Sequence, residues 1–493
     1  MNEKDILRAL GGVSPEFIAD AAPKEKLRHR NPMLFRLIAA LISVAILMGA
    51  LFAAIVVPKI VNEMFVPTPS PYGRYVLSLA KYPEMMQMPK REDYASYSEY
   101  SDAKYDWQRA TAKQSGSGLN GESVAKLYPF FSDFTSEALK TDKDENLVVS
   151  PLTMYMLLSM LGEMTDGETR EQIFDVLNIS TIEELRTLAS GVWNSTYCDN
   201  GGFKSVLANS VWLDESIRFN RNVAHTLSEI YYASSFEGDF SKKKYVSEYC
   251  NWMNENTGNL FGFSPENASV DDQTLMSIVS TLYFESAWRD DNSFNSNNNY
   301  NDVFHTNSGD VEVTYMKRMI ERHLFGSEYF YATYLELGSD GKMWIFLPDE
   351  EDTVEDVLSS KDFMNLVTKG NGVECKEYEI TLSLPKFDIT SHDSAEKYLE
   401  RLGITDIFGA NADFSPVTDS NVAVGEILQG ARLKIDEEGV VGGAYSEAVI
   451  YYGEPLPLQK NIDLVVNRPF VVAITTRANL PLFIGVVNDP TKN

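Results

Sequence analysis

The residues that most often carry catalysis or bind metals are few in this chain, and their spacing builds no recognisable site. Without a CxxC pair or Cys/His spacing, three cysteines predict neither a disulfide framework nor a structural zinc site. The five histidines form no HExxH pair, and the chain has no Gly-x-Ser-x-Gly elbow and no phosphate-binding loop. We therefore expect no enzyme activity, no metal and no cofactor. The cysteines are Cys198, Cys250 and Cys375.

One stretch near the C-terminus has a pattern that suits burial of a single face. Every second residue from Val440 to Tyr452 is uncharged, and the first five of them are small. The one charge in the stretch, Glu447, falls on the opposite face. As a strand, this segment could enter a core without burying a carboxylate, which would cost several kcal/mol. Chance remains an alternative in a chain with only 23 % charged residues.

Composition excludes two classes of protein. The chain has 493 residues, with 43 Lys and Arg against 71 Asp and Glu, so its formal net charge is −28. Such acidity argues against a nucleic-acid partner, which needs a clustered basic surface. Apolar residues make up 44 % and aromatic residues 12 %, which predicts a folded protein rather than a disordered acidic tail.

The N-terminal part of the chain predicts a membrane anchor. Residues 1–36 carry about two more basic than acidic side chains, and the 21 residues from Leu37 to Val57 contain no charge. A helix of that length reaches roughly 30 Å, the thickness of a bilayer core. Because the basic residues precede it, the positive-inside rule places residues 1–36 in the cytoplasm and the folded part outside the cell. The pattern predicts a single-pass cell-membrane protein, and it fits a bacterial surface protein.

Residues 58–120 predict an extracellular stalk. Pro-Thr-Pro-Ser-Pro at 67–71 favours a stiff, extended backbone, and Gln-Ser-Gly-Ser-Gly at 114–118 is typical of a flexible joint. Residues 94–107 are polar and rich in tyrosine, without a clear apolar face.

From Gly121 onward the apolar pattern predicts helices mixed with strands. Ser150 and Pro151 are typical of a helix start, and an apolar run follows at 154–164. Later segments alternate like strands without regular helices between them, which favours an α+β fold with large, mostly antiparallel sheets. These segments are 206–213, 343–348, 378–387, 469–476 and 480–487.

A series of short motifs in the same part of the chain resembles the serpin family. In order, the motifs are Asn146-x-x-x-Ser150-Pro151-x-Thr153, ANSVWL, YCNWMNENTGNLF, MSIVSTLYFESAW, LPKFDIT, LGITDIFGANADFSPVTDS, IDEEG, and NRPF followed by LFIGVVNDP. Eight motifs in a fixed order over residues 120–493 carry a resemblance that no single motif would.

The resemblance implies one serpin domain over residues 121–493, with about eight or nine helices, an exposed reactive loop and a monomeric state. It also implies a mechanism. A target protease cleaves the reactive loop and forms an acyl-enzyme, and the loop then inserts into the main sheet as an extra strand. The attached protease is distorted before it can hydrolyse the acyl bond. The chain is thus expected to be a suicide-substrate inhibitor of serine endopeptidases, with cysteine endopeptidases as a further target class.

The resemblance also assigns the hinge and the reactive bond. Counting from the hinge glycine to where the family's reactive bond usually lies gives Gly453–Glu454. The loop is longer than is typical, so Tyr452, Ile450 and Val449 remain alternatives. The hinge residues would be Glu437, Glu438, Gly439, Val440, Val441, Gly442, Gly443 and Ala444.

These residues set the expected class of target protease. Cleavage after Tyr452 would suit chymotrypsin-like or subtilisin-like enzymes, and cleavage after Ile450 or Val449 would suit elastase-like enzymes. Trypsin-like enzymes are not expected, because no Lys or Arg lies between Gly439 and Gln459.

The region where the family's main sheet opens departs from the usual pattern. Where serpins typically have an Asn and a His, this chain has Ser280 and Gln429, and Gln429 can hydrogen-bond without titrating. Val440 stands where a Thr is usual, and both residues are β-branched. The residues assigned to this region are Ser150, Pro151, Thr153, Ser280, Trp288 and Gln429. A non-inhibitory serpin that acts as a surface binding or adhesion protein is the alternative function.

Overall fold

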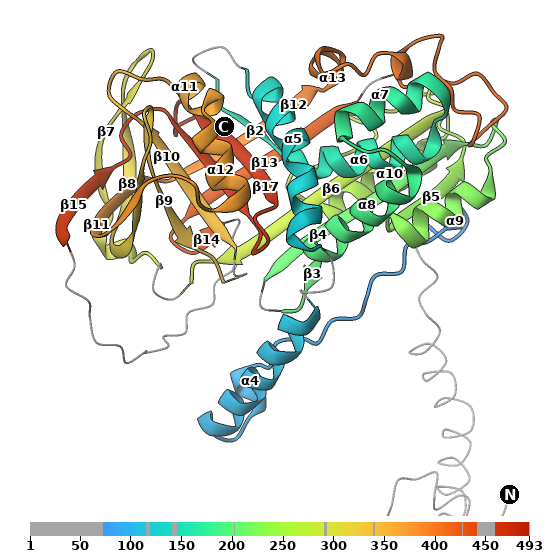
Figure 1. The fold of residues 1–493 in the computed structure, drawn as a ribbon. Helices are drawn as coiled ribbons and strands as arrows, with labels where there is room; N and C mark the ends of the chain where they lie inside the picture. Colours follow the sequence, from blue (N-terminus) through green and yellow to red (C-terminus); the bar gives the residue numbers. More distant parts are fainter. Residues whose placement is uncertain are drawn as a thin grey trace, which may run out of the picture. The chain divides into compact units, whose positions relative to one another are not determined.

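Two large β-sheets and ten α-helices make up the part of the chain that the computed structural model describes (Figure 1). Tyr72–Asn493 forms one compact unit. The described residues are 72–114, 119–140, 145–201, 203–289, 293–338, 341–425, 427–440 and 459–492.

Most helices begin at a side chain that caps the first turn. Side-chain oxygens of Asn120, Ser150 and Thr181 each accept a hydrogen bond from a backbone N–H three residues ahead. Pro151 occupies the first turn after Ser150, so the predicted helix start is confirmed. The α-helices are α4 (Tyr97–Gln114), α5 (Gly121–Ala138), α6 (Pro151–Met164), α7 (Gly167–Leu177), α8 (Ile182–Thr196), α9 (Arg221–Ile230), α10 (Lys243–Asn256), α11 (Val354–Ser359), α12 (Lys361–Lys369) and α13 (Glu396–Leu402), and 3-10 turns lie at Arg91–Asp93, Ser296–Asn298 and Asp406–Phe408.

The first sheet has eight strands and contains the candidate site. Its order is β1-β5-β4-β6-β14-β13-β12, with β3 paired to β4. All pairs are antiparallel except β4 with β5. The strands are β1 (Val76–Ser78), β3 (Cys198–Asp199), β4 (Lys204–Asp214), β5 (Ala233–Gly238), β6 (Met276–Ala287), β12 (Phe387–Ser394), β13 (Leu428–Asp436) and β14 (Gly439–Val440).

The second sheet has nine strands in the order β15-β11-β8-β9-β10-β16-β17-β2, with β7 paired to β8. Only β11 with β15 is parallel. The strands are β2 (Leu147–Val149), β7 (Tyr300–Thr306), β8 (Gly309–Gly326), β9 (Phe330–Glu336), β10 (Lys342–Pro348), β11 (Cys375–Pro385), β15 (Gln459–Val465), β16 (Phe470–Thr475) and β17 (Pro481–Val487).

Helix α6 lies at the centre of the main core. All of its residues are buried, because it packs against α5, α7 and α8 and against strands β6 and β17. An apolar run without a polar face suits a helix that is enclosed on every side. Helix α6 and strands β6 and β13 surround the candidate site described below.

The predicted α+β class and the mostly antiparallel sheets are confirmed. Strands β4, β10, β11, β16 and β17 occupy the five segments expected to be strands. Within residues 121–492 the described part of the chain holds nine α-helices, α5 to α13, in agreement with the expected eight or nine. A further helix, α4, precedes this range and forms in the tyrosine-rich segment that shows no clear apolar face.

The predicted membrane localisation requires correction. In the part of the chain that the structure describes, no helix is both long and apolar enough to cross a membrane. The most apolar helix, α6, would span only about 21 Å, and other protein elements cover it. Residues 1–36 and the predicted transmembrane segment Leu37–Val57 lie outside the described residues. The predicted single-pass arrangement, with an extracellular folded part, is therefore withdrawn.

Part of the segment predicted to be a stalk packs on the folded unit. Strand β1 pairs with β5 at the edge of the first sheet, and Tyr72 and Tyr75 are each only 7 % exposed. Further along, Met88 donates its backbone N–H to the carbonyl oxygen of Asn200 over 2.7 Å.

Candidate functional site

A two-residue strand, β14, lies between β6 and β13. Val440 pairs with Ser286 of β6 and with Ile435 of β13, in both cases antiparallel. Its side chain is 1 % exposed and lies on the buried side of the sheet. The start of the predicted hinge thus occupies the place of a strand between two others.

Gly439 allows the chain to enter β14. Its φ is 148°, which residues with a side chain rarely adopt. A Cβ at this position would lie 2.3 Å from the carbonyl oxygen of Ser286. Both the backbone conformation and the close approach of β6 therefore require glycine.

Trp288 connects the end of β6 to the turn before β14. Its indole Nε1 donates a hydrogen bond to the carbonyl oxygen of Asp436 over 2.9 Å. Its backbone N–H donates to the carbonyl oxygen of Glu438 over 3.4 Å. The side chain is 3 % exposed. Trp288 therefore ties two strands together at the end of the sheet where β14 begins.

Glu437 fixes the same turn through polar contacts. Its Oε1 lies 2.6 Å from Nζ of Lys386, and Nδ2 of Asn299 donates to the same oxygen. Burial opposes ionisation of the carboxyl, but these hydrogen bonds outweigh it and hold the pKa of Glu437 below its ordinary value.

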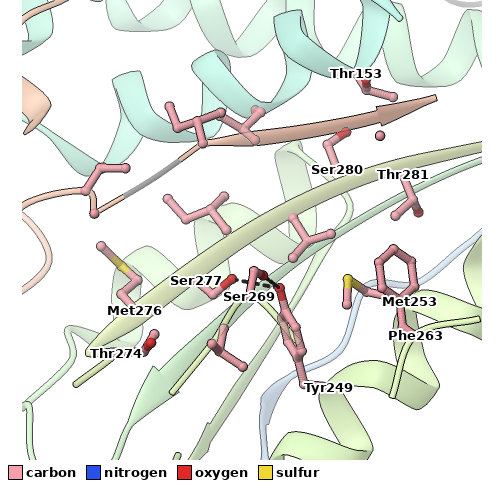
Figure 2. A pocket seen from close by; sticks show the side chains of 18 of the residues that line it. Thr153, Tyr249, Met253, Phe263, Ser269, Thr274, Met276, Ser277, Ser280 and Thr281 are labelled. Atoms are coloured by element: carbon pink, nitrogen blue, oxygen red, sulfur yellow. Dashed lines mark hydrogen bonds between the residues drawn. The ribbon is translucent and has the colours of Figure 1, made fainter. Parts of the chain in front are cut away.

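Past Val440 the two flanking strands separate and leave a cavity. In the described sheet β6 and β13 are not hydrogen-bonded to each other, and a cavity of about 490 Å³ lies between them (Figure 2). Figure 2 shows Tyr249 of α10 beside β6, with its hydroxyl 3.2 Å from Oγ of Ser277. The lining includes Met276, Ile278, Ser280 and Leu282 of β6, Val424, Ile427 and Gly430 near the start of β13, Leu157 and Leu161 of α6, and Met253 of α10.

Hydrogen bonds join β13 to the start of α6 at the edge of this cavity. Nε2 of Gln429 donates to the carbonyl oxygen of Ser150 over 2.9 Å. The hydroxyl of Tyr398 donates to Oε1 of Gln429 over 3.4 Å. Oγ of Ser150 accepts from the backbone N–H of Thr153 over 3.3 Å, which caps the helix.

Ser280, on the facing strand β6, makes no corresponding contact. Its hydroxyl is buried and has no hydrogen-bond partner among the residues described. Figure 2 shows Ser280 in the space between the two strands. Among the described residues, the structure thus brings Gln429 and Ser150 together and leaves Ser280 without a hydrogen bond to either.

The rest of the predicted hinge and every candidate reactive bond lie outside the described residues. These positions are Val441, Gly442, Gly443, Ala444, Val449, Ile450, Tyr452, Gly453 and Glu454. Their roles remain predictions.

Several contacts of the site were missed in the sequence. Asn299 and Lys386 contact Glu437 from 138 and about 50 residues away along the chain. Tyr398 lies 31 residues before its partner Gln429. No local sequence pattern signals contacts between residues so far apart. Tyr398 shows only the spacing of an ordinary buried helix residue.

The site offers backbone hydrogen bonding rather than catalytic groups. The edges of β6 and β13 that face each other across the cavity present N–H and C=O groups, which are templates for pairing with a further strand. No group of three His, Cys, Asp or Glu side chains in the described ranges could hold a metal ion.

Comparisons with known proteins agree with this arrangement. A sequence model of the serpin family, described as serine protease inhibitor, matches residues 127–490. Serpin-ZX of Arabidopsis thaliana is 27 % identical over 370 residues, covering 71 % of this chain and 93 % of the relative. Plasminogen activator inhibitor 1 of Neovison vison is 26 % identical over 375 residues, which cover 72 % of this chain and 90 % of the relative.

Solved structures show the same fold. The serpin tengpin in its native state has a TM-score of 0.65 at 23 % identity, covering 75 % of this chain and 95 % of that one. Arabidopsis AtSerpin1, in its native stressed conformation, has a TM-score of 0.64 at 24 % identity. The match covers 76 % of this chain and 100 % of AtSerpin1.

These matches bear on three predictions: that the chain is not an enzyme, that it is bacterial, and that it is anchored in a membrane. Serpins bind target proteases and are generally inhibitors of them rather than enzymes, although some are non-inhibitory, which agrees with the prediction that this chain is not an enzyme. The relatives named above, from Arabidopsis and Neovison, lend no support to a bacterial source or a membrane anchor. With the family matched over residues 127–490 and the fold shared with its solved members, the chain belongs to the serpin family.

Proposed function

We propose that this protein is a suicide-substrate inhibitor of serine endopeptidases, and by the same acyl-enzyme chemistry of cysteine endopeptidases. After cleavage, the residues that follow Val440 would insert between β6 and β13 and carry the attached protease with them. The observation that supports this most is β14, which already lies between the two strands with an open cavity beyond it.

The register of β14 indicates where each loop residue would go. Continued past Val440, it would place Ala444 between Leu282 and Ala431, and Ser446 between Ser280 and Gln429. Even-numbered residues would then face the core, as Val440 does, and Glu447 would face outward. The partnerless hydroxyl of Ser280 would gain a polar neighbour.

The length of the gap bears on where the reactive bond lies. The same register would bring Ile450 opposite Met276, the first residue of β6. A bond after Ile450, Tyr452 or Gly453 would release a strand long enough to reach Met276, whereas a bond after Val449 would leave the last position unpaired. The register therefore argues only against Val449, and chymotrypsin-like, subtilisin-like and elastase-like targets all remain.

The test is the formation of a covalent complex. The chain is mixed with chymotrypsin, subtilisin or elastase, and the products are separated in SDS. We expect a one-to-one SDS-resistant adduct, and the N-terminal sequence of the released fragment locates the reactive bond. Clean loop cleavage without an adduct for every serine and cysteine protease tested would contradict the proposal.

Two variants test whether insertion causes trapping. Ala444→Arg puts a charge on the face that would be buried and should convert the inhibitor into a substrate, because burying an unpaired charge costs several kcal/mol. Tyr445→Arg puts the same charge on the outward face and should still form the adduct. Equal behaviour of the two variants would exclude strand insertion in this register.

Thermal stability separates the inhibitor from the non-inhibitory alternative. An inserted loop completes the sheet, so the cleaved chain should unfold at a markedly higher temperature than the intact chain. A surface binding protein with an inert loop should show no such rise.

A further inference from the structure

The segment Tyr72–Ser78, which we name the N-terminal clamp, adds an edge strand to the first sheet. Val76 pairs with Phe236 of β5, and the backbone N–H of Glu237 donates to the carbonyl oxygen of Tyr75 over 2.7 Å. The segment precedes residue 127, where the match to the serpin family begins. This strand is therefore an addition of this chain to the part that the family match covers.

Tyr72 joins the sheet edge to the last turn of α10. Its hydroxyl donates to Oε2 of Glu255 over 2.7 Å. Its ring lies 6.2 Å from Trp212 of β4, edge-on, and 5.5 Å from Phe236 of β5. Tyr72 is only 7 % exposed, so its packing is shielded from water, whereas its hydrogen bond reaches the exposed side chain of Glu255 and is half-buried.

Tyr75 contacts the other end of the same helix. Its ring lies 4.9 Å from that of Tyr245 in the first turn of α10. Tyr245 in turn packs closely over Gly238 of β5, where a Cβ would lie 2.5 Å from its ring. The two tyrosines of the clamp thus hold both ends of α10 against β4 and β5.

Helix α10 also covers the cavity between β6 and β13. Tyr249 and Met253 line the cavity, and the hydroxyl of Tyr249 lies 3.2 Å from Oγ of Ser277 on β6. Past α10, the carbonyl oxygen of Leu260 accepts a hydrogen bond from Nη1 of Arg432 on β13 over 3.2 Å. Helix α10 and the turn after it therefore connect the strands on both sides of the gap.

We propose that the N-terminal clamp regulates how readily the gap between β6 and β13 widens, by holding α10 in place across it. A strand that fills the gap needs β6 and β13 about two strand spacings apart, close to 10 Å, along its whole length. With α10 fastened at both ends, any widening to that spacing strains the contacts of Tyr72 and Tyr75. The consequence for protease trapping rests on the proposed function, but the effect on α10 does not.

The test compares hydrogen exchange in full-length variants by mass spectrometry. Tyr72→Ala combined with Tyr75→Ala should speed exchange in α10 and in residues 276–282 by at least about tenfold, because two buried aromatic side chains and the half-buried hydrogen bond to Glu255 are lost. Tyr72→Phe, which removes only the hydroxyl, should give a smaller increase. Tyr105→Ala is the matched control, because Tyr105 is 61 % exposed on α4 and should leave exchange unchanged.

Each result decides the proposal. If exchange rises only in β1 and β5 while α10 and residues 276–282 stay protected, the clamp does not hold α10. If the double variant fails to fold, Tyr72→Phe alone decides, and unchanged exchange in α10 contradicts the proposal.

A second readout concerns trapping by the same variants. With chymotrypsin, the double variant should give a larger share of adduct relative to cleaved inhibitor, because the gap opens more easily. Faster exchange with an unchanged share would overturn the regulatory part. Absence of adduct from both the variant and the parent chain would contradict the proposed function and leave the exchange result to judge the clamp.

Discussion

At the scale of single residues, the position of β14 depends on a glycine and on a partly exposed ion pair. Gly439 adopts a φ of 148° directly against β6. Two residues earlier, Glu437 is held by Lys386 and Asn299. The first contact is steric and independent of pH, whereas the second requires a charged carboxylate, so the two can be tested separately.

Replacing Gly439 by Ala should destabilise the native protein. The new Cβ would clash with backbone atoms of Ser286 and force an unfavourable φ, which costs about 1–3 kcal/mol. Urea unfolding of the intact chain measures the loss. Gly425→Ala is the control, because a Cβ there meets nothing within 4 Å. Equal stability of the two variants would mean that the turn relaxes without cost.

Acid should remove the contribution of Glu437. Because its folded-state pKa is lowered, its contribution is complete above the ordinary Glu pKa of about 4.3 and disappears as the pH falls through the lower folded-state value. The stability difference between the parent chain and Glu437→Gln, measured by urea unfolding, should therefore shrink below about pH 4. Glu328→Gln, at an exposed position, should show no such trend. A difference that stays constant down to pH 3 would contradict this role.

At the scale of elements, both β6 and β13 lie close to α6, but Gln429 of β13 adds a side-chain hydrogen bond that Ser280 of β6 does not. Gln429 bridges β13 to the first turn of α6, whereas Ser280 of β6 reaches no partner across the gap. One wall of the cavity is therefore anchored to the core helix by a polar contact that the other wall lacks.

Substitutions at these two positions should differ in sign or size. Gln429→Ala removes one of the three hydrogen bonds that the carbonyl oxygen of Ser150 accepts, together with the bond from Tyr398, and should cost about 1–3 kcal/mol. Ser280→Ala removes a buried hydroxyl that has no partner, so it should be neutral or stabilising by up to about 1 kcal/mol. Urea unfolding of both variants gives the comparison. A loss for Ser280→Ala as large as that for Gln429→Ala would show that the hydroxyl has a partner in solution.

Much of this element arrangement follows from local sequence, and the rest depends on distant contacts. The start of α6 at Ser150 and the alternating strand segments were predictable, because capping and alternation are local properties. Strand β1 was not, because its partner Phe236 lies far along the chain and its three residues show no pattern of their own. The hinge role predicted for Gly439 rests on the family resemblance, and the ion pair of Glu437 with Lys386 was not predicted.

At the scale of the whole molecule, the charge of −28 governs approach rather than fold. Repulsion between like charges disfavours anionic surfaces, and attraction should speed encounter with a protease of positive net charge. The effect acts over roughly 10 Å at 0.1 M salt and over less at higher salt.

The rate of adduct formation with a cationic protease should therefore fall as ionic strength rises. The second-order rate constant is measured between low and high salt, with a protease of near-zero net charge as the control. The control rate should change little. A rate that is independent of salt for the cationic enzyme would exclude electrostatic steering.

The two residues of β14 have a consequence for timing. Zipping a strand into a sheet normally begins with a slow nucleation step, in which chain entropy is lost before hydrogen bonds compensate for it. Here the first pairs, Val440 with Ser286 and with Ile435, are already made. In the proposed mechanism only propagation would remain after cleavage, so insertion would begin earlier relative to hydrolysis of the acyl bond.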